Sequence, residues 1–105
     1  MTTVMSSLVV DRGPVRDAAL LLINRSTLAD HVVTSDDGAY GTRIEMDQAG
    51  VPFELWGSGT QALWRLLSAI AYTRHEISLY EVVSRLDQPN RAAVSDAISV
   101  LCRAA

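Results

Sequence analysis

The chain has 105 residues, of which 49% are hydrophobic and 20% charged, and its formal net charge at pH 7 is −3. This length and composition exclude a disordered or low-complexity chain and are typical of one folded domain, which we expect to span residues 1–105. The nine cationic residues are all arginine. The acidic balance argues against a general nucleic-acid binder, because such affinity depends on neutralising phosphates.

Cysteine usage and hydropathy indicate a cytoplasmic protein. The single cysteine, Cys102, cannot form an internal disulfide, which fits a reducing compartment. No stretch approaches the roughly 18 apolar residues of a membrane span, and residues 1–13 lack the charged start and long apolar core of a signal peptide. We therefore expect no membrane association. The absence of lysine suggests the coding bias of a high-GC bacterium.

The first third of the chain predicts one helix. Residues 1–13 contain a weak apolar alternation that fits a short strand or a loose arm. Pro14 suits the first position of a helix, an acidic residue falls in the first turn, and residues 18–23 are apolar. We predict a helix over 14–24, with residues 26–30 either continuing it or forming a second turn.

The middle of the chain changes to the two-residue period of strands. Residues 40–47 and 51–56 each alternate apolar with polar side chains, and the segment 47–50 between them has the composition of a hairpin turn. A further turn signal at 35–38 allows residues 31–34 to add a third strand. We predict a small antiparallel β-meander of two or three strands.

The second half of the chain predicts three helices. Ser58 with Gln61, and Ser78 with Glu81, have the spacing of a capping box, in which the two side chains satisfy early helix amides. Asn90 is the candidate cap of the last helix. The positions predicted to face the core are Leu63, Leu66, Leu67, Ile70, Leu79, Val82, Val83, Leu86, Val94, Ala97, Ile98 and Leu101. The fold class is therefore α+β, with the meander packed by the N-terminal helix and by a C-terminal three-helix unit.

The glycine-rich turn from Gly57 to Thr60 is the first candidate site, because a turn of this kind before a helix can bind phosphate. A P-loop needs a lysine, and the chain has none. A dinucleotide-binding unit needs a parallel strand after the helix, whereas this sequence continues as helix. We interpret the turn as a helix start, at which Ser58, Gly59 and Thr60 form at most a site for an anion or a partner's carboxylate.

The titratable residues form no recognisable catalytic or metal-binding set in the sequence. His31 and His75 are far apart, and neither has a second histidine or cysteine at the spacing of metal ligands. Cys102 falls late in an amphipathic pattern, where a buried or half-buried structural role is expected. We predict no cofactor and no catalytic residue. An enzyme or small-ligand binder stays as an alternative, which requires a pocket that joins either histidine to carboxylates.

The segment "ISLYEVVSRLDQPNRAAVSDAISVLCR", residues 77–103, resembles the two-helix part of bacterial helix-turn-helix regulators. The resemblance implies a DNA-binding regulator whose contacts would come from Arg85, Asn90, Arg91 and Ser95. The segment departs from that pattern in a shorter turn, in an aspartate in place of the turn glycine, and in a second helix with few donors for base edges. Acidic residues also balance the nearby arginines, which favours a helical hairpin for packing or partner contact.

Residues 53–105 more loosely resemble small uncharacterised proteins from actinobacteria. In those proteins a serine-glycine turn leads to a leucine-rich helix and then to a Leu-Asp…Asn…Val…Ala segment, and the same order is present here. The resemblance implies a shared arrangement of elements and brings no activity with it.

Two tryptophans are candidate anchors of a partner surface. Trp56 and Trp64 flank the glycine-rich turn, and tryptophan is enriched at protein interfaces. Packing in the core is the alternative for both. We expect a non-catalytic interaction or regulatory module that acts through a protein partner or through homodimerisation.

Overall fold

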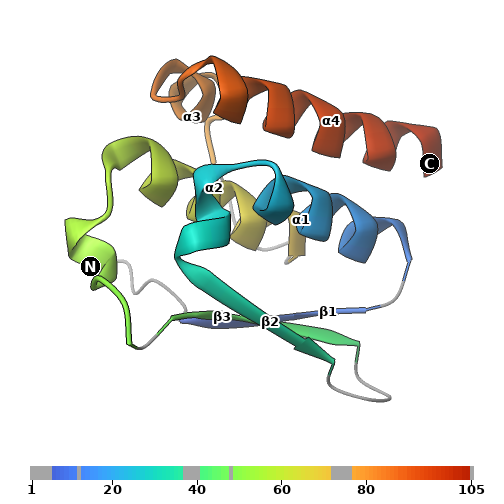
Figure 1. Cartoon of the computed structure of the whole chain (residues 1–105). Helices are drawn as coiled ribbons and strands as arrows, with labels where there is room; N and C mark the ends of the chain where they lie inside the picture. Colours follow the sequence, from blue (N-terminus) through green and yellow to red (C-terminus); the bar gives the residue numbers. More distant parts are fainter. Residues whose placement is uncertain (1–5, 12, 37–40, 48, 72–76, 105) are drawn as a thin grey trace.

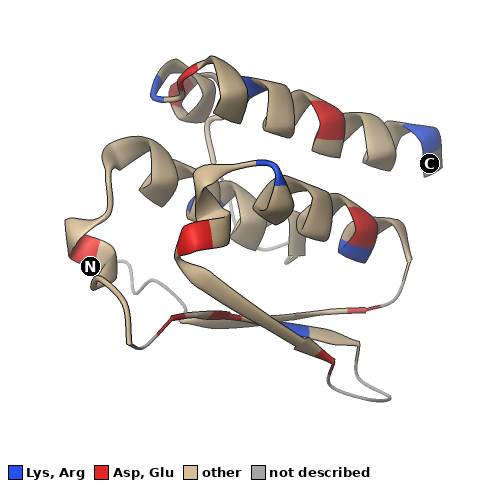
Figure 2. Cartoon of the chain, viewed as in Figure 1, with Lys and Arg blue, Asp and Glu red and all other residues tan. Residues whose placement is uncertain are grey.

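The computed structural model describes residues 6–11, 13–36, 41–47, 49–71 and 77–104, in which helices stack on a small sheet (Figure 1). The strands are β1 (Ser7–Val10), β2 (Val32–Asp36) and β3 (Thr42–Met46). The α-helices are α1 (Pro14–Asn24), α2 (Ser58–Ala71), α3 (Leu79–Ser84) and α4 (Gln88–Ala104), and the short 3-10 helices are η1 (Thr27–Asp30) and η3 (Phe53–Leu55). This is the α+β class predicted from the sequence. Charged residues of both signs lie on α1 and α4 (Figure 2).

The sheet has the strand order β1-β3-β2, with both pairs antiparallel. Ile44 of β3 lies opposite Leu8 of β1, so their side chains share one face of the sheet. Leu8, Val10 and Ile44 are buried on that face, where α1 and α2 contact the sheet. The N-terminal segment, for which a strand and a loose arm are both expected, is thus a strand, and the predicted third strand is β2.

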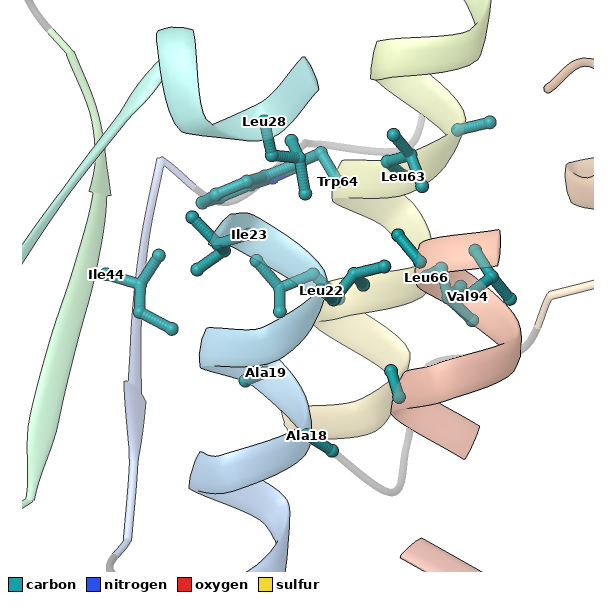
Figure 3. Packing of buried hydrophobic residues seen from close by; sticks show 14 of the residues in the cluster. Ala18, Ala19, Leu22, Ile23, Leu28, Ile44, Leu63, Trp64, Leu66 and Val94 are labelled. Atoms are coloured by element: carbon teal, nitrogen blue, oxygen red, sulfur yellow. The ribbon is translucent and has the colours of Figure 1, made fainter. Parts of the chain in front are cut away.

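Helix α1 occupies the middle of the molecule, between the sheet and α4 (Figure 1). Its Ala18 and Ala19 are fully buried, and their small side chains allow neighbouring elements to approach closely. Leu22 and Ile23 follow one turn later and are also buried. Figure 3 shows Ile23 pointing toward Ile44 of the sheet. The helix has the predicted bounds, and its side chains form the centre of the core.

Residues 51–56 form no strand, which corrects the prediction. Both edges of β3 are occupied by β1 and β2, and Pro52 has no amide hydrogen for a strand ladder. The segment instead closes on itself. The Trp56 amide donates to the Phe53 carbonyl, and the Trp56 indole Nε1 donates to the Val51 carbonyl at 2.9 Å. The alternating apolar residues therefore lie in and around the 3-10 helix η3 and not in a strand. The predicted hairpin turn is followed by this 3-10 helix.

The start of α3 follows the predicted capping box more closely than the start of α2. Ser78 caps α3, and its hydroxyl accepts from the Glu81 amide at 3.3 Å. Ser58 is already the first residue of α2. The Gln61 side chain donates to the Phe53 carbonyl at 2.9 Å, so it ties α2 to η3. The predicted capping box at the start of α2 is thus replaced by a contact between two elements.

Candidate functional site

The two tryptophans lie in the core. Trp64 is fully buried and Trp56 is 5% exposed, and their rings meet edge-on with centroids 6.2 Å apart. The Trp56 ring also packs against His31 and Phe53, with centroid distances of 4.8 and 5.0 Å. This packing corrects the expectation that Trp56 and Trp64 anchor a partner surface, because neither ring is accessible to a partner.

The predicted anion site at the start of α2 is largely used by the fold itself. Thr60 is buried, and its hydroxyl shares a 2.7 Å hydrogen bond with the hydroxyl of Thr27 in η1. Gly59 packs against the end of α3, where an added Cβ would lie 2.9 Å from the Arg85 carbonyl oxygen. Ser58 is exposed. The three predicted residues therefore do not present one open surface to an anion.

Asn90 is a buried structural residue. Helix α4 begins at Gln88, and the Asp87 carboxylate caps it by accepting from the Asn90 amide at 3.2 Å. The Asn90 side chain is buried; it accepts from the Thr27 amide at 3.1 Å and donates to the Thr27 hydroxyl at 3.4 Å. Through Thr27 it is linked to Thr60 of α2. Asn90 is expected from the sequence to cap the last helix and, in the DNA-binding alternative, to contact DNA. These contacts correct both expectations, because Asp87 is the cap and the Asn90 side chain is buried.

The other candidate DNA contacts lie on a surface of mixed charge (Figure 2). Arg85 is paired with Glu81 at 3.0 Å, and Arg91 donates its Nε to the Val83 carbonyl at 3.2 Å. Ser95 is exposed on α4. In Figure 2 acidic and basic residues are interspersed along α3 and α4, which is unlike the basic stripe of a DNA-binding helix.

Among the described residues, no group of three or more His, Cys, Asp or Glu side chains is arranged to hold a metal ion. His31 is half-buried and its ring packs against Trp56, whereas His75 and Glu76 lie outside the described residues. Cys102, expected to be buried or half-buried, is exposed because the neighbouring Leu101 takes the inward position of α4. Within the described part of the chain, no helix is both long and apolar enough to cross a membrane.

A groove of about 230 Å³ lies between α2 and α3. Its apolar floor contains the buried Ala62 and Val82 and the half-buried Ile77. Its charged rim is formed by Arg65, Glu81 and Arg85, all of which are exposed. We call this feature the α2–α3 groove. An apolar floor with a charged rim is the usual form of a small contact site for another molecule.

Exposed apolar side chains lie on α3, which forms one wall of this groove, and on η3, whose Phe53 ring is contacted by Arg65. Among the described residues, the two most exposed large apolar side chains are Tyr80 of α3, at 85%, and Leu55 of η3, at 73%. Leu79 of α3 is 47% exposed. Arg65 connects the two elements, because it lines the groove and its guanidinium lies 6.0 Å from the centroid of the Phe53 ring in η3. Arg65 is therefore the residue through which the groove adjoins η3.

Sequence reasoning did not find this surface. The apolar stripe predicts a buried Leu79, but α3 begins at this residue and is short, so its first turn lies at the edge of the packed region. The strand pattern predicts a buried Leu55, but that strand does not form. The sequence contains one signal for this exposure. The Ser78 cap and the break at Pro89 are close in sequence, so the helix between them is too short to bury a full apolar stripe.

Comparison with known protein families, with curated proteins and with solved structures finds no match to this chain.

Proposed function

We propose that this chain is a non-catalytic protein-interaction module that contacts its partner through the α2–α3 groove and the exposed apolar residues of α3 and η3. The observation that carries the proposal is a groove with an apolar floor and a charged rim, together with the exposed Leu55 of η3, the element that Arg65 contacts from the rim. Burial of apolar surface is favourable by about 25 cal/mol per Å², and apolar patches with a polar rim mark contact surfaces. The partner is another protein or a second copy of the chain.

The size of the groove supports a protein segment over a small molecule. Its volume of about 230 Å³ is below the roughly 300–1,000 Å³ of small-molecule pockets. An anchoring side chain from a partner protein needs only a small apolar pocket surrounded by polar groups. The free thiol of Cys102 supports action in a reducing compartment such as the cytoplasm.

Site-specific photocrosslinking tests this proposal. A photoreactive phenylalanine analogue replaces Leu79 or Leu55, the chain is expressed at its native level, and the adducts formed on illumination are identified by mass spectrometry. Val33 is the matched control, because it is 52% exposed and lies on the sheet, at the opposite side of the molecule from α3 (Figure 1). We expect one discrete adduct from Leu79 and Leu55 and none from Val33. Absence of adducts at Leu79 and Leu55, or equal labelling at Val33, contradicts the proposal.

A further inference from the structure

We infer that the α2–α3 groove binds the η3 segment of a second copy of this chain, with Leu55 entering the apolar floor and Glu54 pairing with Arg65. The inference rests on the proposed function and names its partner. The groove and η3 adjoin in each copy, because Arg65 contacts the Phe53 ring. One patch therefore carries both the site and the segment that fills it. Such a patch is self-complementary, and a two-fold axis through it closes a dimer with two identical contacts.

Charge complementarity favours this occupant. Arg65 is exposed, and among the described residues no acidic side chain pairs with it. Glu81 is engaged by Arg85 at 3.0 Å, so Arg65 is the cation of the groove that remains without an acidic partner there. Glu54 of η3 is also exposed and has no ion pair within the described part of the chain. Each copy thus offers one carboxylate and one guanidinium, and the dimer joins them twice.

The exposed apolar surface of η3 also favours this occupant. Leu55 is the more exposed of the two large apolar side chains that flank Glu54 along η3. The groove floor contains Ala62, Ile77 and Val82, so an aliphatic side chain that enters the groove meets apolar neighbours. Insertion of Leu55 removes apolar surface from water on both copies. Because the patch is small, we expect a weak dimer with a dissociation constant of roughly 100 µM.

Charge reversal at the two contact residues tests the inference. Sedimentation equilibrium of the full chain up to about 1 mM covers the range of weak association. Arg65→Glu and Glu54→Arg each replace two ion pairs per dimer by two repulsive contacts, so we expect the dissociation constant to rise at least about tenfold in each variant. Both positions are exposed, and circular dichroism verifies that each variant is folded. Arg103→Glu, on an exposed residue of α4 outside the groove, makes the same change in net charge as Arg65→Glu and is expected to leave association unchanged.

Mixing the two variants provides the strictest test. In a heterodimer of R65E and E54R copies, both contacts regain opposite charges, so the mixture is expected to recover dimerisation, as is the double variant E54R/R65E. A native chain that is monomeric at about 1 mM, single variants with unchanged association, or a mixture without recovery overturns the inference. Any of these results together with a Leu79 photoadduct to a different protein overturns the dimer and leaves the proposed function standing.

Discussion

Replacement of Gly59 by alanine is expected to destabilise the chain where α2 meets α3. A Cβ at this position lies 2.9 Å from the Arg85 carbonyl oxygen and 3.6 Å from Cδ2 of Leu86. Because the closest atom belongs to the backbone, the end of α3 must retreat by about 0.5 Å, and overpacking of this kind costs about 1–3 kcal/mol. The smaller entropy of the unfolded alanine chain offsets about 0.4–1 kcal/mol. The middle values of these two ranges give a net loss in the free energy of unfolding of about 1.3 kcal/mol.

Gly57 provides the matched control for this substitution. A Cβ built at Gly57 has no atom within 4 Å, so G57A is expected to alter the free energy of unfolding by no more than about 0.5 kcal/mol. Urea titration followed by circular dichroism measures both variants. Equal free energies of unfolding for G57A and G59A, or a G59A chain more stable than the native one, would refute the close contact between the two helices.

Three further changes test the core and the surface. N90A removes both hydrogen bonds to Thr27, so we expect the free energy of unfolding to fall by about 2 kcal/mol in thermal denaturation. N24A, at an exposed position, is expected to change the free energy of unfolding by no more than about 0.5 kcal/mol. Equal losses in the two variants contradict the structural role of Asn90. L22A, at a fully buried position, is expected to lower the free energy of unfolding by about 2–5 kcal/mol, as measured by urea titration. A loss as small as that of a surface substitution contradicts the position of Leu22 in the core. Cys102 is expected to react fully with a thiol reagent in the folded chain, and protection until denaturant is added contradicts its exposure.

Elements determined by local chemistry could be predicted from the sequence. Pro14 and the apolar run after it define α1, because a proline at the first helical position and an apolar stripe act within a few residues of each other. Ser78 caps α3 for the same reason, since its hydroxyl and the Glu81 amide are three residues apart. The alternation around Ile44 likewise defines β3 and its buried face.

Features determined by distant partners could not be predicted. Residues 51–56 alternate like a strand, but the edge of β3 they would need is taken by the N-terminal β1. Asn90 has the residue type of a helix cap, yet its side chain binds Thr27, which is 63 residues away. The exposed surface on α3 and η3 likewise depends on contacts between residues that are distant in the sequence. Leu55 is exposed because its segment forms a 3-10 helix outside the sheet.

Self-association of the chain through the α2–α3 groove is tested most directly by amide chemical shifts measured as a function of chain concentration. Between about 10 µM and 1 mM, we expect concentration-dependent shifts at residues 53–55, 62–65 and 77–85, the segments that form the groove and η3. The amides of β2 are expected to stay unchanged. Invariant groove amides over this range, or shifts confined to β2, contradict self-association through the groove.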